Sequence, residues 1–309
     1  MQKFNNVLMQ ALTKKSTDEL VSASKHSELK KTLNAFDLII LGIGAVVGTG
    51  IFTIVGIAAQ GGDGGIAAGP SLTISMIIAA IACVFSALCY SEFASMIPVA
   101  GSAYTYTYAT MGEFMAWMVG WILMLEYAIG NITVASAWTG YFTQFLKGFK
   151  DILPAFVLNC PMWLRNDYRT IYALCDKFGW DVHDKMPFIH LPNFLPINEI
   201  PIAINIPAIF IVFVLTLVLI KGIKESTKFA SIMVGVNMFI IISFIVMGSF
   251  YVKPENWTPF MPNGFDGVFM GAFVIFFAYI GFDAVSTTAE ETQNPQRDLP
   301  IGILGTLVI

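Results

Sequence analysis

The sequence predicts an all-α integral membrane protein that crosses a bilayer several times. Of its 309 residues, 56% are hydrophobic and 12% are charged, whereas about a quarter of the residues in a soluble domain are charged. Six apolar runs approach the length of roughly 20 residues that a helix needs to cross the hydrocarbon core. The first of these runs is also unusually rich in glycine, and this run guides the functional interpretation.

The N-terminal segment 1–32 is polar and shows no cleavable signal-peptide pattern. It contains six lysines and no arginine. A second lysine cluster, formed by Lys221, Lys224 and Lys228, follows the fourth apolar run. Lysine-rich short segments favour the cytoplasmic side of a membrane. We therefore expect 1–32 to be a cytoplasmic tail and 33–309 to be a transmembrane domain.

The first apolar run, 38–59, has glycine at four of the nine positions from 42 to 50. Each interior glycine costs a helix about 1 kcal/mol relative to alanine, so the helix can unwind here. The N-terminus of a helix beyond such a break can bind an anionic group such as a carboxylate. The alternative is close helix packing through Gly44 and Gly48, although the Thr49 hydroxyl is not needed for packing. A nucleotide loop is rejected because it requires a preceding strand.

The second and third apolar runs, 70–96 and 112–141, each predict a continuous span. Glu126 lies in the middle of the third span, where an acidic side chain costs about 2.5–3.5 kcal/mol on insertion scales. That cost favours a functional role for Glu126. The alternative is a protonated, structural glutamate that is hydrogen-bonded across helices.

Residues 148–199 form a long polar loop, which we expect to be extracytoplasmic and disordered. Outside the cytoplasm, Cys160 and Cys175 could pair, and closing a loop of about 15 residues would stabilise the fold by ~3 kcal/mol. The cysteines and histidines of the loop do not have a recognised metal-site spacing. The sequence therefore predicts no metal and no cofactor.

Three further apolar runs, 200–220, 229–252 and 268–289, predict the fourth, fifth and sixth spans. The sixth contains Gly281 followed two residues later by Asp283. A glycine and an acid this close together inside a membrane helix predict a second helix break.

Four stretches of the chain carry a resemblance to a known family. They are residues 42–52 (GIGAVVGTGIF), 89–106, 112–121 and 276–286 (FFAYIGFDAVS), the last followed by 290–300. In this order and at this spacing they resemble the amino acid–polyamine–organocation superfamily. Within it, they are most similar to the cationic amino acid transporter group, especially its bacterial branch. The resemblance covers 33–309 apart from the polar loop.

This resemblance implies the N-terminal half of a leucine-transporter-type five-plus-five inverted repeat, in which helices 1 and 6 are broken and face each other. The two breaks predicted from glycine fall in those two helices. The resemblance also implies amino acid transport by alternating access in the cell membrane, without covalent chemistry. The expected partners are an amino acid and the lipid bilayer, and not nucleic acid.

The resemblance further assigns roles to individual positions. Backbone groups that would bind the substrate α-carboxylate lie around Val46, Gly48, Thr49 and Gly50. Carbonyl groups that would bind the α-ammonium lie around Phe277, Ala278 and Ile280. Phe277 would also be an aromatic gate over the substrate. The third helix would line the pocket with Glu126, Tyr127 and Asn131.

Asn237 and Asp283 occupy positions that the resemblance links to coupling or gating. Proton-coupled bacterial relatives have a lysine in the fifth helix where this chain has Asn237. Burial lowers the pKa of a lysine and lets it exchange a proton, whereas asparagine does not titrate. We therefore expect weaker dependence on a proton gradient than in relatives with lysine.

Two other classes of protein compete with a transporter. A membrane-embedded enzyme would need a base or a metal-ligand set, and no histidine lies in any predicted span. A non-transporting fragment is the second alternative, because the sequence ends about nine residues into a seventh apolar run, ~14 Å of a ~30 Å core. On that basis these residues alone are expected to move no amino acid. The sequence indicates neither the amino acid nor the oligomeric state.

Overall fold

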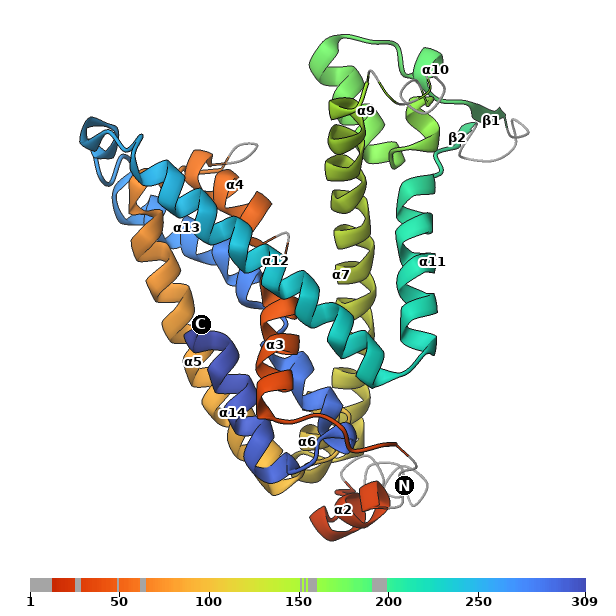
Figure 1. Cartoon of the computed structure of the whole chain (residues 1–309), viewed down its shortest axis with the longest axis vertical. Helices are drawn as coiled ribbons and strands as arrows, with labels where there is room; N and C mark the ends of the chain where they lie inside the picture. The colour runs from red at the N-terminus through yellow and green to blue at the C-terminus, as the bar shows by residue number, and fades with distance from the viewer. Residues whose placement is uncertain are drawn as a thin grey trace, which may run out of the picture. The chain divides into compact units, whose positions relative to one another are not determined.

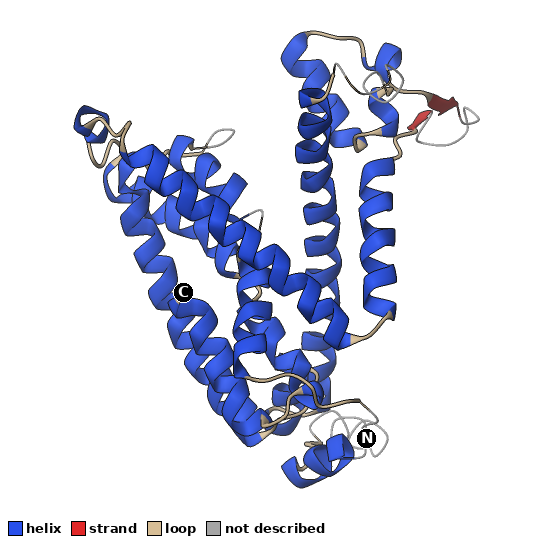
Figure 2. Ribbon diagram, viewed as in Figure 1, coloured by secondary structure: helices blue, strands red, loops and turns tan. Residues whose placement is uncertain are grey.

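The computed structural model describes residues 13–25, 29–48, 50–61, 65–150, 152, 154, 160–190 and 199–309. These residues are mainly helical, with one two-stranded sheet (Figure 1, Figure 2). The chain divides into two compact units, Met1–Met124 with Gly222–Ile309 and Leu125–Lys221.

The first unit contains most of the membrane-length helices. In chain order its elements are α2 (Thr17–Lys25), α3 (Ala35–Val46), the π-helix η1 (Gly50–Ile54), α4 (Val55–Gln60), the 3₁₀-helix η2 (Gly69–Ser71), α5 (Leu72–Met96), α6 (Ser102–Thr110), the start of α7 (Glu113–Gly148), α12 (Ile223–Ser249), the 3₁₀-helix η4 (Pro254–Trp257), α13 (Gly264–Tyr279), the 3₁₀-helix η5 (Phe282–Glu291) and α14 (Pro295–Val308).

Four helical segments are long and apolar enough to cross a membrane: Gly69–Met96, Glu113–Gly148, Ile223–Ser249 and Gly264–Glu291. Two shorter apolar helices, α3 and α11 (Ile206–Ile220), accompany them. The helical, multi-pass architecture predicted from the apolar runs is therefore confirmed. The first predicted span is divided between α3, η1 and α4.

The start of α3 is fixed by a reciprocal capping interaction. The Asn34 side chain accepts hydrogen bonds from the backbone N–H groups of Phe36 and Asp37, at 2.8 and 3.1 Å. The Asp37 carboxylate in turn accepts a 3.0 Å bond from the Asn34 N–H. Such a capping box satisfies donors that otherwise have no partner at a helix N-terminus.

Glycines allow α14 to pack closely against α3. A Cβ atom on Gly42 would overlap the Thr306 side chain, and one on Gly302 would lie 2.7 Å from the Leu38 Cβ. Leu38 is fully buried, and α14 also contacts α5. Small residues let membrane helices approach in this way.

The residues before α3 are joined to the turn between η5 and α14. The N–H groups of Thr32 and Leu33 donate to the Glu291 carbonyl at 2.9 and 3.0 Å, and the Gln293 N–H donates to the Leu33 carbonyl at 2.9 Å. Nearer the N-terminus, the Lys15 N–H donates to the Tyr108 carbonyl of α6.

The second unit contains the rest of α7, a small lobe and α11. The lobe comprises the 3₁₀-helix η3 (Met162–Leu164), α9 (Tyr168–Phe178), α10 (Val182–Lys185) and the antiparallel strands β1 (Phe188–His190) and β2 (Glu199–Pro201). In α11, the N-terminal cap Asn205 also accepts a 2.8 Å hydrogen bond from the Thr139 hydroxyl of α7.

The expectation that the polar loop is disordered is wrong for its described residues. Ile171, Cys175 and Met186 are almost fully buried and form a small core. The Asp167 side chain caps α9, and Gly179 ends it with φ +65°. Cys160 and Cys175 are both free thiols, so the possible disulfide is not formed.

Several predicted helix boundaries also differ from the structure. α11 begins at Ile206 rather than near 200, because Glu199–Pro201 is paired as β2. α12 begins at Ile223 and so includes two of the clustered lysines. α14 begins at Pro295 rather than 301, since proline suits the first turn of a helix.

Candidate functional site

The first helix break lies between α3 and η1. α3 ends at Val46, and the Val47 and Gly48 N–H groups donate to the carbonyls of Ile43 and Val46 at 2.7 and 3.0 Å. The π-helix then begins at Gly50. The predicted interruption is thus present in the structure. Thr49, at the centre of the predicted carboxylate site, lies outside the described residues.

The second helix break lies between α13 and η5. α13 ends at Tyr279, and Ile280 is extended, with ψ 135°. Gly281 has φ +124°, a conformation that side chains with a Cβ rarely adopt. Phe282 then begins the 3₁₀-helix. The second predicted interruption is also present.

The two breaks lie against each other. A Cβ atom placed on Gly281 would lie 3.1 Å from both the carbonyl carbon and the carbonyl oxygen of Ala45, in the last turn of α3. Around this point α3 contacts η5, whereas η1 and α4 contact α13 (Figure 1). Val46 packs on the core that contains Phe282 and Val285. Sequence reasoning missed Ala45. The available signal was Gly281, the glycine that packs against it.

Backbone groups at this junction offer both charge polarities to a ligand. Helix ends in general leave their last carbonyls and first N–H groups without partners in the same helix, although at the end of α3 the Val46 carbonyl is bonded to the Gly48 N–H. Helix dipoles make the N-terminal ends favourable for an anion and the C-terminal ends favourable for a cation. The arrangement suits a zwitterion that carries a carboxylate and an ammonium group.

The remaining predicted residues of the first unit differ in how exposed they are. Phe277 is 66% exposed, Ala278 and Ile280 are half-buried, and Asp283 is buried at 8% exposure. Asn237 is half-buried on α12, which contacts α3.

The predicted residues of α7 belong to the second unit. Glu126 and Tyr127 are half-buried, and Asn131 is exposed. The structure therefore brings together the predicted positions of α3, α13 and η5, but it does not place this third group relative to them. Among the residues that the structure describes, no three His, Cys, Asp or Glu side chains gather as a metal site.

Comparisons with known proteins agree with this architecture. A family described as amino acid permease matches residues 33–309. The branched-chain amino acid permease BcaP of Bacillus subtilis (strain 168) is 44% identical over 297 residues, which are 96% of this chain and 56% of that protein. The methylthioribose transporter of the same strain is 41% identical over 296 residues, with the same two shares.

A plant relative is also similar. Cationic amino acid transporter 1 of Arabidopsis thaliana is 36% identical over 305 residues, which are 99% of this chain and 44% of that protein. The chain thus spans about half the length of the curated relatives it matches.

Proposed function

The chain belongs to the amino acid permease family, and we propose that it serves the transport of an amino acid across a membrane by alternating access. The observation that carries the proposal is the contact of Gly281 with the Ala45 carbonyl, because it joins two helix breaks at one point. Such paired breaks supply unpaired backbone donors and acceptors inside a bilayer, where a substrate can bind them.

In this proposal the substrate α-carboxylate is bound by the backbone at the first break. The groups concerned belong to Val46, Gly48, Thr49 and Gly50. The α-ammonium is bound by carbonyl groups at the end of α13, on Phe277, Ala278 and Ile280. The exposed ring of Phe277 closes over the bound substrate.

The α7 residues are proposed to line the substrate pocket. They are Glu126, Tyr127 and Asn131. As a test, Glu126→Gln is expected to change substrate selectivity or pH dependence. A lower yield of folded protein with unchanged selectivity would instead assign Glu126 a structural role.

We propose that transport needs no cofactor. We also propose that substrate movement is coupled to little or no proton transfer at Asn237. Since an asparagine does not titrate, ligand binding is expected to vary less with pH than after Asn237→Lys. Asp283, buried beside the second break, is proposed to act in gating. A steep pH dependence in the unmodified protein, equal to that of Asn237→Lys, would contradict this assignment.

The proposed setting is the cell membrane, with the N-terminus in the cytoplasm. The lysine-rich segment 1–32 and the lysines that precede or begin α12 support this orientation. Relatives are named for branched-chain amino acids, for cationic amino acids and for methylthioribose. The substrate class must therefore be decided by experiment.

The deciding experiment is a binding screen of the purified protein in lipid nanodiscs. The screen uses the twenty amino acids and methylthioribose, with the thermal unfolding midpoint as the readout. We expect a saturable increase for one group of amino acids, since a ligand that binds the folded state raises its stability. Stabilisation by methylthioribose alone, or by no compound, would contradict the proposal.

A further inference from the structure

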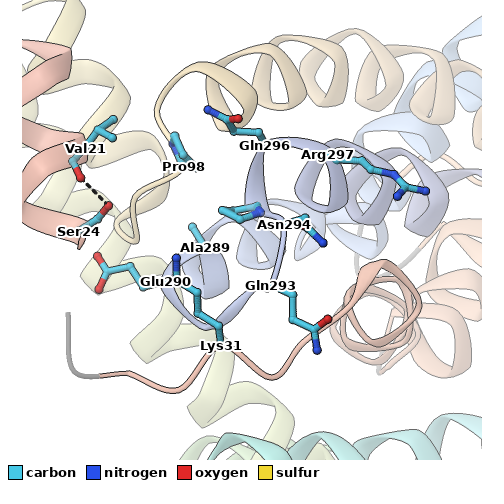
Figure 3. Close-up of a pocket in the computed structure, with 11 residues that line it drawn as sticks. Val21, Ser24, Lys31, Pro98, Ala289, Glu290, Gln293, Asn294, Gln296 and Arg297 are labelled. Atoms are coloured by element: carbon cyan, nitrogen blue, oxygen red, sulfur yellow. Dashed lines mark hydrogen bonds between the residues drawn. The ribbon is translucent and has the colours of Figure 1, made fainter. Parts of the chain in front are cut away.

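A cavity lies apart from the paired helix breaks. Its volume is about 460 Å³, within the range of roughly 300–1,000 Å³ that is usual for small-molecule sites. It is an open pocket bordered by α2, the residues before α3, the loop after α5 and the junction of η5 with α14 (Figure 3). None of the predicted substrate-site residues lines it, so this cavity is a separate site.

The cavity lining mixes polar and apolar residues and carries a small positive balance. Lys31 and Arg297 contribute two positive charges and Glu290 one negative charge, which leaves a net charge of +1. In Figure 3, Glu290 lies on the side formed by Val21 and Ser24 of α2, and Arg297 lies on the opposite side. Side-chain amides complete the lining: Gln293, Asn294 and Gln296.

The three charged side chains and the Asn294 amide make no hydrogen bond or ion pair with the rest of the described chain, whereas the Gln293 amide bonds to the Thr32 carbonyl. No ion pair joins Lys31, Glu290 and Arg297 to one another or to other described residues. Asn294 precedes α14, yet its side chain makes no capping hydrogen bond. The two cations and this amide are exposed, so a ligand can reach them from solvent.

Backbone hydrogen bonds hold the two walls of the cavity together. Immediately after Lys31, the Thr32 N–H donates to the Glu291 carbonyl at 2.9 Å, and the Gln293 side-chain amide donates to the Thr32 carbonyl at 3.2 Å. Leu33, which bonds to the same turn, is 2% exposed. The backbone next to Lys31 is thus held beside the segment that carries Glu290 and Arg297, which lowers the cost of bringing the two walls together on binding.

We propose that this cavity binds the phosphate group of an anionic ligand and thereby ties the segment before α3 to α14. Arginine and lysine are the usual partners of phosphate, and amide side chains donate further hydrogen bonds to its oxygens. Basic pockets at the ends of membrane helices bind phospholipid headgroups in this way. The same chemistry would accept a soluble phosphate ester. Glu290 opposes the ligand charge and keeps the binding weak and reversible.

Charge-altering variants test the proposal by the sign of their effects. Lys31→Gln and Arg297→Gln are each expected to weaken binding about fivefold, which corresponds to one cation near a phosphate. Glu290→Gln is expected to strengthen binding, because it removes the one repulsive charge. Lys30→Gln is the matched control, since Lys30 is exposed like Lys31 but does not line the cavity.

Two arms distinguish the source of the phosphate. The protein in phosphatidylcholine nanodiscs is titrated with glycerol 3-phosphate against chloride at equal ionic strength, and the thermal midpoint is recorded. In the other arm, phosphatidylglycerol replaces part of the phosphatidylcholine. Stabilisation in the first arm identifies a soluble phosphate ester, and stabilisation in the second identifies a lipid headgroup.

Either result supports the proposal if the lining variants shift affinity in the predicted directions and Lys30→Gln does not. No stabilisation of the unmodified protein in both arms would overturn it. Lining variants that behave like Lys30→Gln would overturn it as well. The readout is phosphate binding rather than amino acid binding, so failure here and failure of the proposed transport function are distinguishable.

Discussion

At the first helix break a Cβ atom on Gly48 would meet no described atom beyond its chain neighbours within 4 Å, whereas at the second a Cβ on Gly281 would lie 3.1 Å from the Ala45 backbone. The backbone conformations differ too, because Gly281 has φ +124° and Gly48 is not in the left-handed region. The glycine at the second break is therefore required by the fold. The glycine at the first break has no such requirement among the described residues, so its open space is available to a ligand.

The largest expected effect on folding follows from filling the tight break. Gly281→Val forces a β-branched residue into a left-handed conformation, at about 1–3 kcal/mol. Crowding of the Ala45 backbone adds roughly 1–3 kcal/mol. We expect a lower thermal unfolding midpoint and a low yield of folded protein. Gly248→Val on α12 is the control, because its Cβ would meet nothing within 4 Å; equal losses for both variants would contradict the tight contact.

A smaller effect is expected where α3 meets α14. Gly42→Ala places a methyl group on the Thr306 side chain, and overpacking of this kind costs about 1–3 kcal/mol. In contrast, a Cβ on Gly235 of α12 would meet nothing within 4 Å. Gly235→Ala is therefore expected to raise stability, because alanine favours a helix by about 1 kcal/mol relative to glycine. Thermal unfolding in detergent should thus move in opposite directions for the two variants. A rise for both would mean that α3 and α14 are not closely packed.

A still smaller effect is expected away from both breaks. Ser75 of α5 is fully buried and donates a 2.7 Å hydrogen bond to the Val268 carbonyl of α13. Bonds between membrane helices contribute about 0.6 kcal/mol on average, so Ser75→Ala should lower stability by roughly that amount. Ser249→Ala loses only a bond to its own helix and is the comparison. A loss no larger than that of Ser249→Ala would count against the contact.

The smallest expected effect is on the stability of the lobe, which belongs to the second unit. Burial opposes ionisation of Asp167, but hydrogen bonds from the Thr170 hydroxyl and N–H outweigh it and lower the pKa of this carboxyl. Its stabilising contribution is therefore present above the unfolded-state pKa and is lost as pH falls through the folded-state pKa. Hydrogen exchange of α9 amides should rise in acid, after correction for intrinsic rates. Asp167→Asn, which keeps the cap, should remove that acid-dependent rise.

The breaks were predictable because glycine density and the Gly281–Asp283 pair are local signals. The lobe was missed because its overall polarity obscured a short amphipathic helix. Its signals were Ile171 and Cys175 one turn apart, after the capping residue Asp167 and before Gly179. Contacts such as Gly42 with Thr306 join residues far apart in sequence, and no local pattern reports them. Likewise, the mid-span depth of Glu126 predicts a role without indicating what the side chain faces.

The central claim is that the paired breaks form the amino acid site, and amino acid binding to Gly48→Val tests it most directly. A Cβ there meets no described atom beyond its chain neighbours within 4 Å, so the stability without ligand should change by no more than about 0.5 kcal/mol. The valine side chain would nevertheless occupy the space proposed for the carboxylate, and the affinity for the amino acid selected by the screen should fall roughly tenfold or more. An unchanged affinity in a fully folded Gly48→Val protein would show that the substrate binds elsewhere.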